Sequence, residues 1–140
     1  MPSLPAATDF LVRSALLQIL WTSLLGWMMT IAHQPWGGAF VKLRSRDVAM
    51  AHVDWIMLSL VQIATAYILT LKVVPEALLL ARLIAFSGWY APTVYMLRAW
   101  GINGFRLDGR KAIDTVVGLL GFTGTAAFTY AWCQIVRAWL

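Results

Sequence analysis

Two histidines are the side chains of this sequence best suited to bind a metal ion or a haem. His33 lies at the end of one long apolar run, and His52 lies near the start of the next. A neutral imidazole binds iron through Nε2 while a carbonyl or carboxylate holds Nδ1. A hydrogen-bonded core position is the alternative role for His52, and a solvated position at a helix end is the alternative for His33.

Polar side chains in the same apolar run as His52 are few, so each of them is a functional candidate. On a helix, Ser59 and Gln62 share a face with His52, whereas Asp54 points to another face. A helix that is polar on two faces is covered by protein on both. We therefore expect residues 48–71 to lie centrally in a bundle or at a subunit interface.

Groups on the other apolar runs reach the depth of His52 if each run is a helix that rises about 1.5 Å per residue. Tyr90 and Tyr95 reach that depth on the third run, where Pro92 is expected to kink the helix. Residues 27–30 of the first run and 114–118 of the last run reach it as well. We expect these groups to surround one pocket.

The elements that carry these residues are membrane helices. Of 140 residues, 61% are hydrophobic and 12% are charged, whereas soluble domains have roughly 45–50% apolar and about 25% charged residues. Four apolar runs are long enough to span a bilayer, and they lack the alternation of barrel strands: residues 11–33, 48–71, 75–97 and 112–138. The sequence predicts an all-α fold, an integral membrane four-helix bundle with a single domain over residues 1–140. Nucleic acid is excluded as a partner, and the lipid bilayer is expected.

The distribution of Lys and Arg predicts how this bundle is oriented. The connections 34–47 and 98–111 share one side of the membrane, and both chain ends share the other side with the short turn 72–76. The first side carries seven positive residues: Lys42, Arg44, Arg46, Arg98, Arg106, Arg110 and Lys111. The second side carries three: Arg13, Lys72 and Arg137. The positive-inside rule places both termini outside the cytoplasm, and we expect a bacterial inner membrane.

Small residues in the last apolar run predict close helix packing. Gly118, Gly121 and Gly124 are followed by a stretch rich in Ala and Thr. Small side chains let helix backbones approach closely in a membrane. The contact lies either within the bundle or between protomers, and a homo-oligomer is expected.

The layout of these motifs resembles the styrene oxide isomerases and the related hydroxylaminobenzene mutases. The resemblance rests on four short apolar helices, the basic connection Arg44-Ser45-Arg46, the pair Ala51-His52 and the tripeptide Gly88-Trp89-Tyr90. The family carries an asparagine somewhat under two turns after the histidine. In this chain Leu58 and Ser59 occupy that stretch.

The resemblance implies a trimeric membrane enzyme that binds ferric haem b and rearranges a small apolar epoxide to an aldehyde. His52 would be the axial ligand of the iron, with Ser59 and Trp55 as further haem-binding residues. Tyr90, Tyr95 and Asp54 would be the catalytic polar groups near the substrate. The chain has no C-x-x-C-H motif, so the haem would be bound non-covalently.

Two other classes of function remain open from the sequence. The chain is alternatively a non-catalytic subunit or assembly factor of a larger membrane complex, in which Asp54 and Arg82 contact partner helices. It is alternatively an electron-transfer anchor, in which His33 and His52 bind one haem from both sides. A small proton-coupled exporter is the least favoured class, because such carriers need a carboxylate in the first helix and residues 14–33 contain none.

Overall fold

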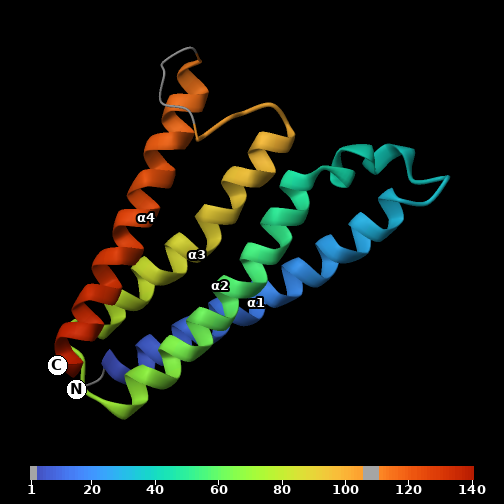
Figure 1. Ribbon diagram of the computed structural model, residues 1–140. Coiled ribbons are helices and arrows are strands. Elements are labelled where there is room, and N and C mark those ends of the chain that lie inside the picture. Colours follow the sequence, from blue (N-terminus) through green and yellow to red (C-terminus); the bar gives the residue numbers. More distant parts are fainter. Residues whose placement is uncertain (1–2, 106–110) are drawn as a thin grey trace.

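The computed structural model describes residues 3–105 and 111–140. The described elements are α1 (Ser3–Ala32), the 3₁₀ helix η1 (Gly38–Arg44), α2 (Arg46–Leu71), α3 (Ala77–Ala99) and α4 (Ala112–Trp139). No strand occurs in these two ranges. The four α-helices are each long and apolar enough to cross a membrane, so the prediction of an all-helical chain with four candidate membrane spans is confirmed (Figure 1).

The helices begin at places that the apolar runs alone did not predict. α1 begins at Ser3, well before the expected residue 11, because Pro5 is tolerated in a first turn and Arg13 Nε donates to Asp9 Oδ1 at 2.9 Å one turn away. α2 begins at Arg46 instead of residue 48, and the Ser45 hydroxyl caps it by accepting the Val48 N–H. Capping and one-turn polar pairs therefore extend two helices beyond their apolar cores.

The turn between α2 and α3 differs from the expected helix start at residue 75. α3 begins at Ala77, and Glu76 before it has a φ of 54°. This left-handed backbone conformation is uncommon for a residue with a side chain. Glu76 therefore belongs to the turn, and its side chain makes no capping hydrogen bond to α3. Farther along, α3 continues as a helix through Pro92.

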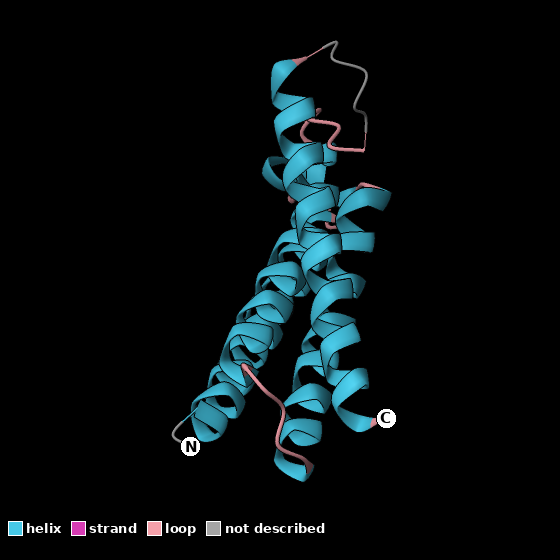
Figure 2. Cartoon of the chain, turned by 90° about the vertical axis from the view of Figure 1, so that its left-hand side faces the viewer, coloured by secondary structure: helices cyan, strands magenta, loops and turns pink. Residues whose placement is uncertain are grey.

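Both chain ends and the α2–α3 turn lie at one end of the molecule, whereas η1 and the α3–α4 connection lie at the other. Figures 1 and 2 show this arrangement from two directions. The chain therefore crosses the molecule four times with alternating direction, as the sequence predicted. Of the basic residues assigned to the η1 end, Arg106 and Arg110 lie outside the described residues.

α3, rather than the second helix, is the central helix of the bundle. It packs against α1, α2 and α4, whereas α2 packs against α1 and α3, and α4 packs mainly against α3. The physical reason lies in side-chain size: Ala81, Ala85 and Gly88 of α3 are buried, and small residues allow close approach from several sides. The sequence placed residues 48–71 either centrally in the bundle or at a subunit interface. Within one chain α3 holds the central place, and one face of α2 carries large exposed apolar residues such as Met57 and Leu60, so a subunit interface at α2 stays a prediction.

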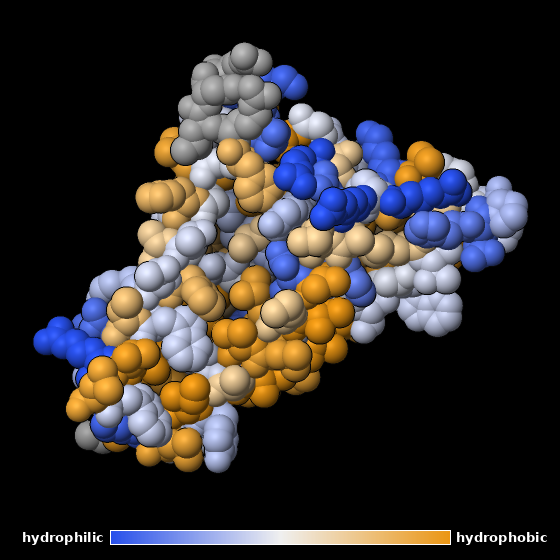
Figure 3. Space-filling model, viewed as in Figure 1, coloured by the Kyte–Doolittle hydropathy of each residue, from blue (hydrophilic) through white to orange (hydrophobic). Residues whose placement is uncertain are grey.

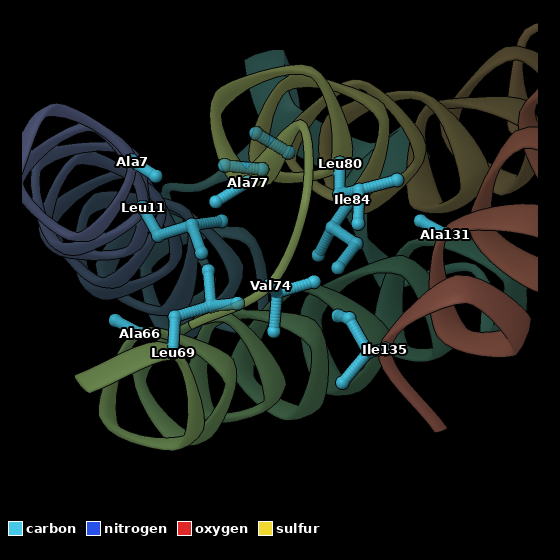
Figure 4. Packing of buried hydrophobic residues seen from close by; sticks show 12 residues of the cluster. Ala7, Leu11, Ala66, Leu69, Val74, Ala77, Leu80, Ile84, Ala131 and Ile135 are labelled. Atoms are coloured by element: carbon cyan, nitrogen blue, oxygen red, sulfur yellow. The ribbon is translucent and has the colours of Figure 1, made fainter. Parts of the chain in front are cut away.

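The apolar core consists of two clusters, one near each end of the bundle. The cluster near the chain ends includes Leu11 of α1, Leu69 of α2, Ile84 of α3 and Ile135 of α4 (Figure 4). The cluster near η1 includes Leu25 of α1, Leu43 of η1 and Trp55 of α2. Outside these clusters, large apolar side chains are exposed along all four helices. Figure 3 shows such hydrophobic surface over the middle of one face, as expected for helices in contact with lipid.

A buried layer of polar residues separates the two apolar clusters, and we call it the polar seam. It consists of Ser14, Gln18 and Thr22 of α1, Ser59, Gln62 and Thr65 of α2, and Ser87 of α3. Gln62 Nε2 donates to Gln18 Oε1 at 2.7 Å, and both side chains are fully buried. Gly88 makes room for this pair, because a Cβ there would lie 2.5 Å from Gln62 Nε2.

Candidate functional site

A groove of about 980 Å³ runs between α1 and α2 and carries both histidines of the chain. We call it the histidine groove. Its lining residues are mostly apolar or hydroxyl-bearing: Ile19, Thr22, Ser23, Gly26, Trp27, Met29, Thr30, His33, His52, Ile56, Ser59 and Leu60. The groove thus combines two imidazoles with a wall that contains no charged side chain.

The imidazole of His52 packs against α1 at a glycine. A Cβ on Gly26 would lie 3.2 Å from His52 Cε1 and 3.7 Å from His52 Nε2, so the absence of a side chain at Gly26 makes room for the ring. His52 is half-buried. Its Nδ1 atom is buried and has no hydrogen-bond partner in the described chain, which leaves a polar atom unsatisfied at a cost in free energy.

The imidazole of His33 is held differently. Its Nδ1 atom lies 2.8 Å from the Met29 carbonyl oxygen, one turn back along the chain. A protonated Nδ1 donates to that carbonyl and leaves the Nε2 lone pair available. This is the usual arrangement of a metal-binding histidine. His33 is exposed, so its ring is fixed by one hydrogen bond and not by packing.

Of the other residues singled out in the sequence, Ser59 lines the histidine groove. Its hydroxyl donates to the Ile56 carbonyl at 2.7 Å within α2. Trp55 is buried behind the groove, where its indole N–H donates to the Trp89 carbonyl and its ring meets Trp21 edge-on at 5.8 Å. Trp55 therefore links α1, α2 and α3 instead of lining the groove. Asp54 is half-buried and does not line it either.

Neither Tyr90 nor Tyr95 lines the histidine groove. The Tyr90 hydroxyl donates to the Val117 carbonyl of α4 at 3.0 Å, and the Tyr90 ring stacks on Phe86. The Tyr95 ring contacts Phe105 and the guanidinium group of Arg98. The structure brings His52 together with Trp27, Met29 and Thr30 from the expected range 27–30, and also with Gly26. Tyr90 contacts α4, whereas Tyr95 contacts the loop after α3 and packs against the apolar cluster near η1.

The chemistry of the donor set limits what the histidine groove can bind. Among the described residues, no group of three or more His, Cys, Asp or Glu side chains forms a metal site. A metal ion held by protein ligands alone would need more donors than two imidazoles. A haem needs only one or two protein ligands, because the porphyrin supplies the other four nitrogens. The histidine groove offers such a group two imidazoles and a wall without charged side chains.

Sequence reasoning placed residues 27–30 of the first run near His52, but it missed the polar face of α1 that precedes them. The signal was present in the sequence, because Ser14, Gln18 and Thr22 recur every four residues and Gly26 follows at the same spacing. Such residues lie on one helix face. That face forms the α1 half of the polar seam and ends at the glycine against which His52 packs.

Comparison with known proteins gives no relative for this chain. It matches no protein-family model, no curated protein and no solved structure.

Proposed function

We propose that the histidine groove binds haem b with His52 as axial ligand, and that the protein rearranges a small apolar epoxide to an aldehyde. The observation that carries the proposal is the position of the His52 imidazole, which is half-buried and lines a large groove without charged side chains. Its buried Nδ1 atom, which would be hydrogen-bonded in the usual iron ligand, has no partner in the described chain. A histidine that serves only as a core residue normally has its buried nitrogen hydrogen-bonded.

The residues around the groove suit an isomerisation better than a hydrolysis or a redox reaction. A bound ferric haem supplies a Lewis acid. Thr22 and Ser59 donate their hydroxyl protons to carbonyls of their own helices, so these hydroxyls are engaged within the helices. The apolar wall excludes water from a reactive carbocation-like centre. An epoxide rearrangement conserves atoms and electrons, and it therefore needs no external proton or electron donor.

The membrane setting supports the same proposal. Apolar epoxides partition into lipid, and the histidine groove lies between two helices that are candidate membrane spans. We propose that the η1 end faces the cytoplasm of a bacterial cell, because Lys42, Arg44 and Arg46 lie there. We also propose a trimer, on the resemblance to the styrene oxide isomerases and on the exposed apolar face of α4, which includes Leu119 and Phe122.

A turnover assay tests the proposed reaction. Membranes that contain the protein are supplied with hemin and an aryl epoxide such as styrene oxide, and the aldehyde is quantified by gas chromatography. We expect aldehyde formation by the wild type, and a fall to the level of empty membranes for His52→Ala. His33→Ala is the matched control, because it removes an imidazole from the same groove, and it should retain turnover. Equal turnover by His52→Ala and the wild type would overturn the proposal.

A second candidate function is favoured by the hydrogen bond of His33. Because Met29 fixes its Nδ1, His33 is prepared to bind iron through Nε2, and the two histidines together would hold a haem for electron transfer. Ligation by both imidazoles would make the iron low-spin and would leave no position for a substrate. In this case His33→Ala converts the absorption spectrum from low-spin to high-spin. A wild-type spectrum that is high-spin and unchanged in His33→Ala would exclude the electron-transfer function.

A further inference from the structure

A second groove runs along the opposite side of α1, between α1 and α3, and it carries arginines instead of histidines. Its volume is about 660 Å³. We call it the arginine groove, because it is lined by Arg13 of α1 and Arg82 of α3, which lie in the first halves of their helices, toward the end of the molecule that holds the chain termini. Most of its remaining lining is apolar, including Leu17, Phe86 and Trp89.

The two arginines differ in how their charge is compensated. Arg13 forms an ion pair with Asp9 one turn away, with its Nε atom 2.8 Å from Asp9 Oδ2. Arg82 forms no ion pair and no hydrogen bond with any residue in the described ranges 3–105 and 111–140. Arg82 is therefore an uncompensated permanent cation in a helix that is long and apolar enough to span a membrane.

Arg82 lies close enough to one end of α3 for its long side chain to reach the headgroup region of a bilayer. It lies in the second turn of α3, roughly 8 Å from the first residue of that helix at about 1.5 Å per residue. A guanidinium group at this level is costly to leave without an anion, and it extends toward the lipid phosphates when none is supplied by protein.

The length of the arginine groove matches one leaflet. From Arg82 to Thr93 the groove follows α3 for roughly 16 Å at about 1.5 Å per residue. Half of the hydrocarbon core of a bilayer is about 15 Å thick. The apolar wall next to Arg82 therefore has the length that an acyl chain occupies below its phosphate.

We propose that the arginine groove binds one phospholipid from the leaflet that surrounds the chain termini. The Arg82 guanidinium donates to the phosphate oxygens, because its planar fork matches phosphate geometry. An acyl chain lies along Leu17, Ala85, Phe86 and Trp89. The bound lipid supplies the anion that Arg82 lacks in the described chain, and it covers the apolar strip between α1 and α3. This site is independent of the histidine groove and of the reaction proposed there.

Native mass spectrometry of the detergent-purified full chain tests this proposal by titration with phosphatidylglycerol. We expect one tightly bound lipid for the wild type, and an affinity that is about tenfold lower for Arg82→Gln, a change that corresponds to ~1.4 kcal/mol. Arg137→Gln is the matched control, because Arg137 lies at the same end of the molecule outside this groove. Its lipid affinity should equal that of the wild type.

Two further measurements distinguish a phospholipid from free phosphate as the ligand, and a loss of binding from a loss of folding. Arg82→Lys keeps the charge but loses the planar fork, so it should bind lipid more tightly than Arg82→Gln. The helical circular dichroism of every variant should equal that of the wild type. Inorganic phosphate at millimolar concentration should leave the lipid bound. Displacement by inorganic phosphate would overturn the lipid assignment in favour of a free-phosphate site. Equal lipid affinity of Arg82→Gln and Arg137→Gln would overturn the proposal altogether.

Discussion

Two grooves lie on opposite sides of α1, and the side chains that line them differ in chemical type. The histidine groove lies toward η1 and presents two imidazoles, the side chains for which we propose haem binding. The arginine groove lies toward the chain ends and presents a permanent cation beside an apolar wall. The polar seam lies between them, because Thr22 and Ser59 line one groove while Ser14 lines the other. One membrane helix thus borders two grooves of different chemical character, and its buried polar residues form part of the layer between them.

Filling the space beside His52 should have the largest effect, and it should affect only one groove. Gly26→Leu places a side chain where a Cβ alone would already lie 3.2 Å from His52 Cε1, so the ring must move. Overpacking of this kind costs about 1–3 kcal/mol, and we expect haem affinity to fall by roughly ten- to a hundredfold in a hemin titration. Phospholipid affinity should not change.

Gly38→Leu is the control for that substitution, because a Cβ on Gly38 would meet no atom within 4 Å. Its haem affinity should equal that of the wild type. If Gly26→Leu bound haem as tightly as Gly38→Leu, the imidazole of His52 would not be the group that holds the haem.

Breaking the polar seam should lower the stability of the wall between the two grooves. Gln62→Leu removes the hydrogen bond to Gln18 and leaves the Gln18 amide buried without it. We expect the variant to lose about 1–3 kcal/mol of unfolding free energy, measured by denaturation in detergent. The double variant Gln18→Leu/Gln62→Leu leaves no buried amide unsatisfied and should recover most of the loss. If the double variant were less stable than Gln62→Leu, the hydrogen bond between Gln18 and Gln62 would not be the interaction through which the polar seam stabilises the fold.

A smaller effect is expected where α3 approaches the same pair. Gly88→Ala adds a Cβ that would lie 2.5 Å from Gln62 Nε2. The overpacking cost of about 1–3 kcal/mol is partly offset by the higher helix propensity of Ala, about 1 kcal/mol. We expect a net loss of about 1 kcal/mol in the same denaturation experiment.

Gly121→Ala is the matched control for the substitution at Gly88. A Cβ there would meet its nearest neighbour, Val94 Cγ2, at the ordinary contact distance of 3.6 Å. This variant should therefore be as stable as the wild type or slightly more stable. A Gly88→Ala variant as stable as Gly121→Ala would mean that the glutamine pair has room to move.

The sequence predicted the four membrane spans and their alternating direction, because long apolar runs separated by charged connections have few other solutions in lipid. It also predicted that Ser59 and Gln62 share the inner face of their helix, and both are buried. Helical periodicity is sufficient for these conclusions.

The grouping of the candidate residues could not be predicted in the same way. Periodicity says which residues share a helix face, but not which neighbouring helix covers that face. Tyr90 was expected to face the same pocket as His52, yet its hydroxyl donates to the Val117 carbonyl of α4. Trp55 is turned toward α3, where it donates to the Trp89 carbonyl. These contacts depend on how α3 packs among three helices, and no single run of residues encodes that packing.

The most direct test of the account is the absorption spectrum of the detergent-purified chain after addition of hemin. We predict a Soret band for the wild type and for Arg82→Gln, and no protein-dependent Soret band for His52→Ala. Absence of the band in the wild type, or an equal band in His52→Ala, would contradict the assignment of the histidine groove as a haem site.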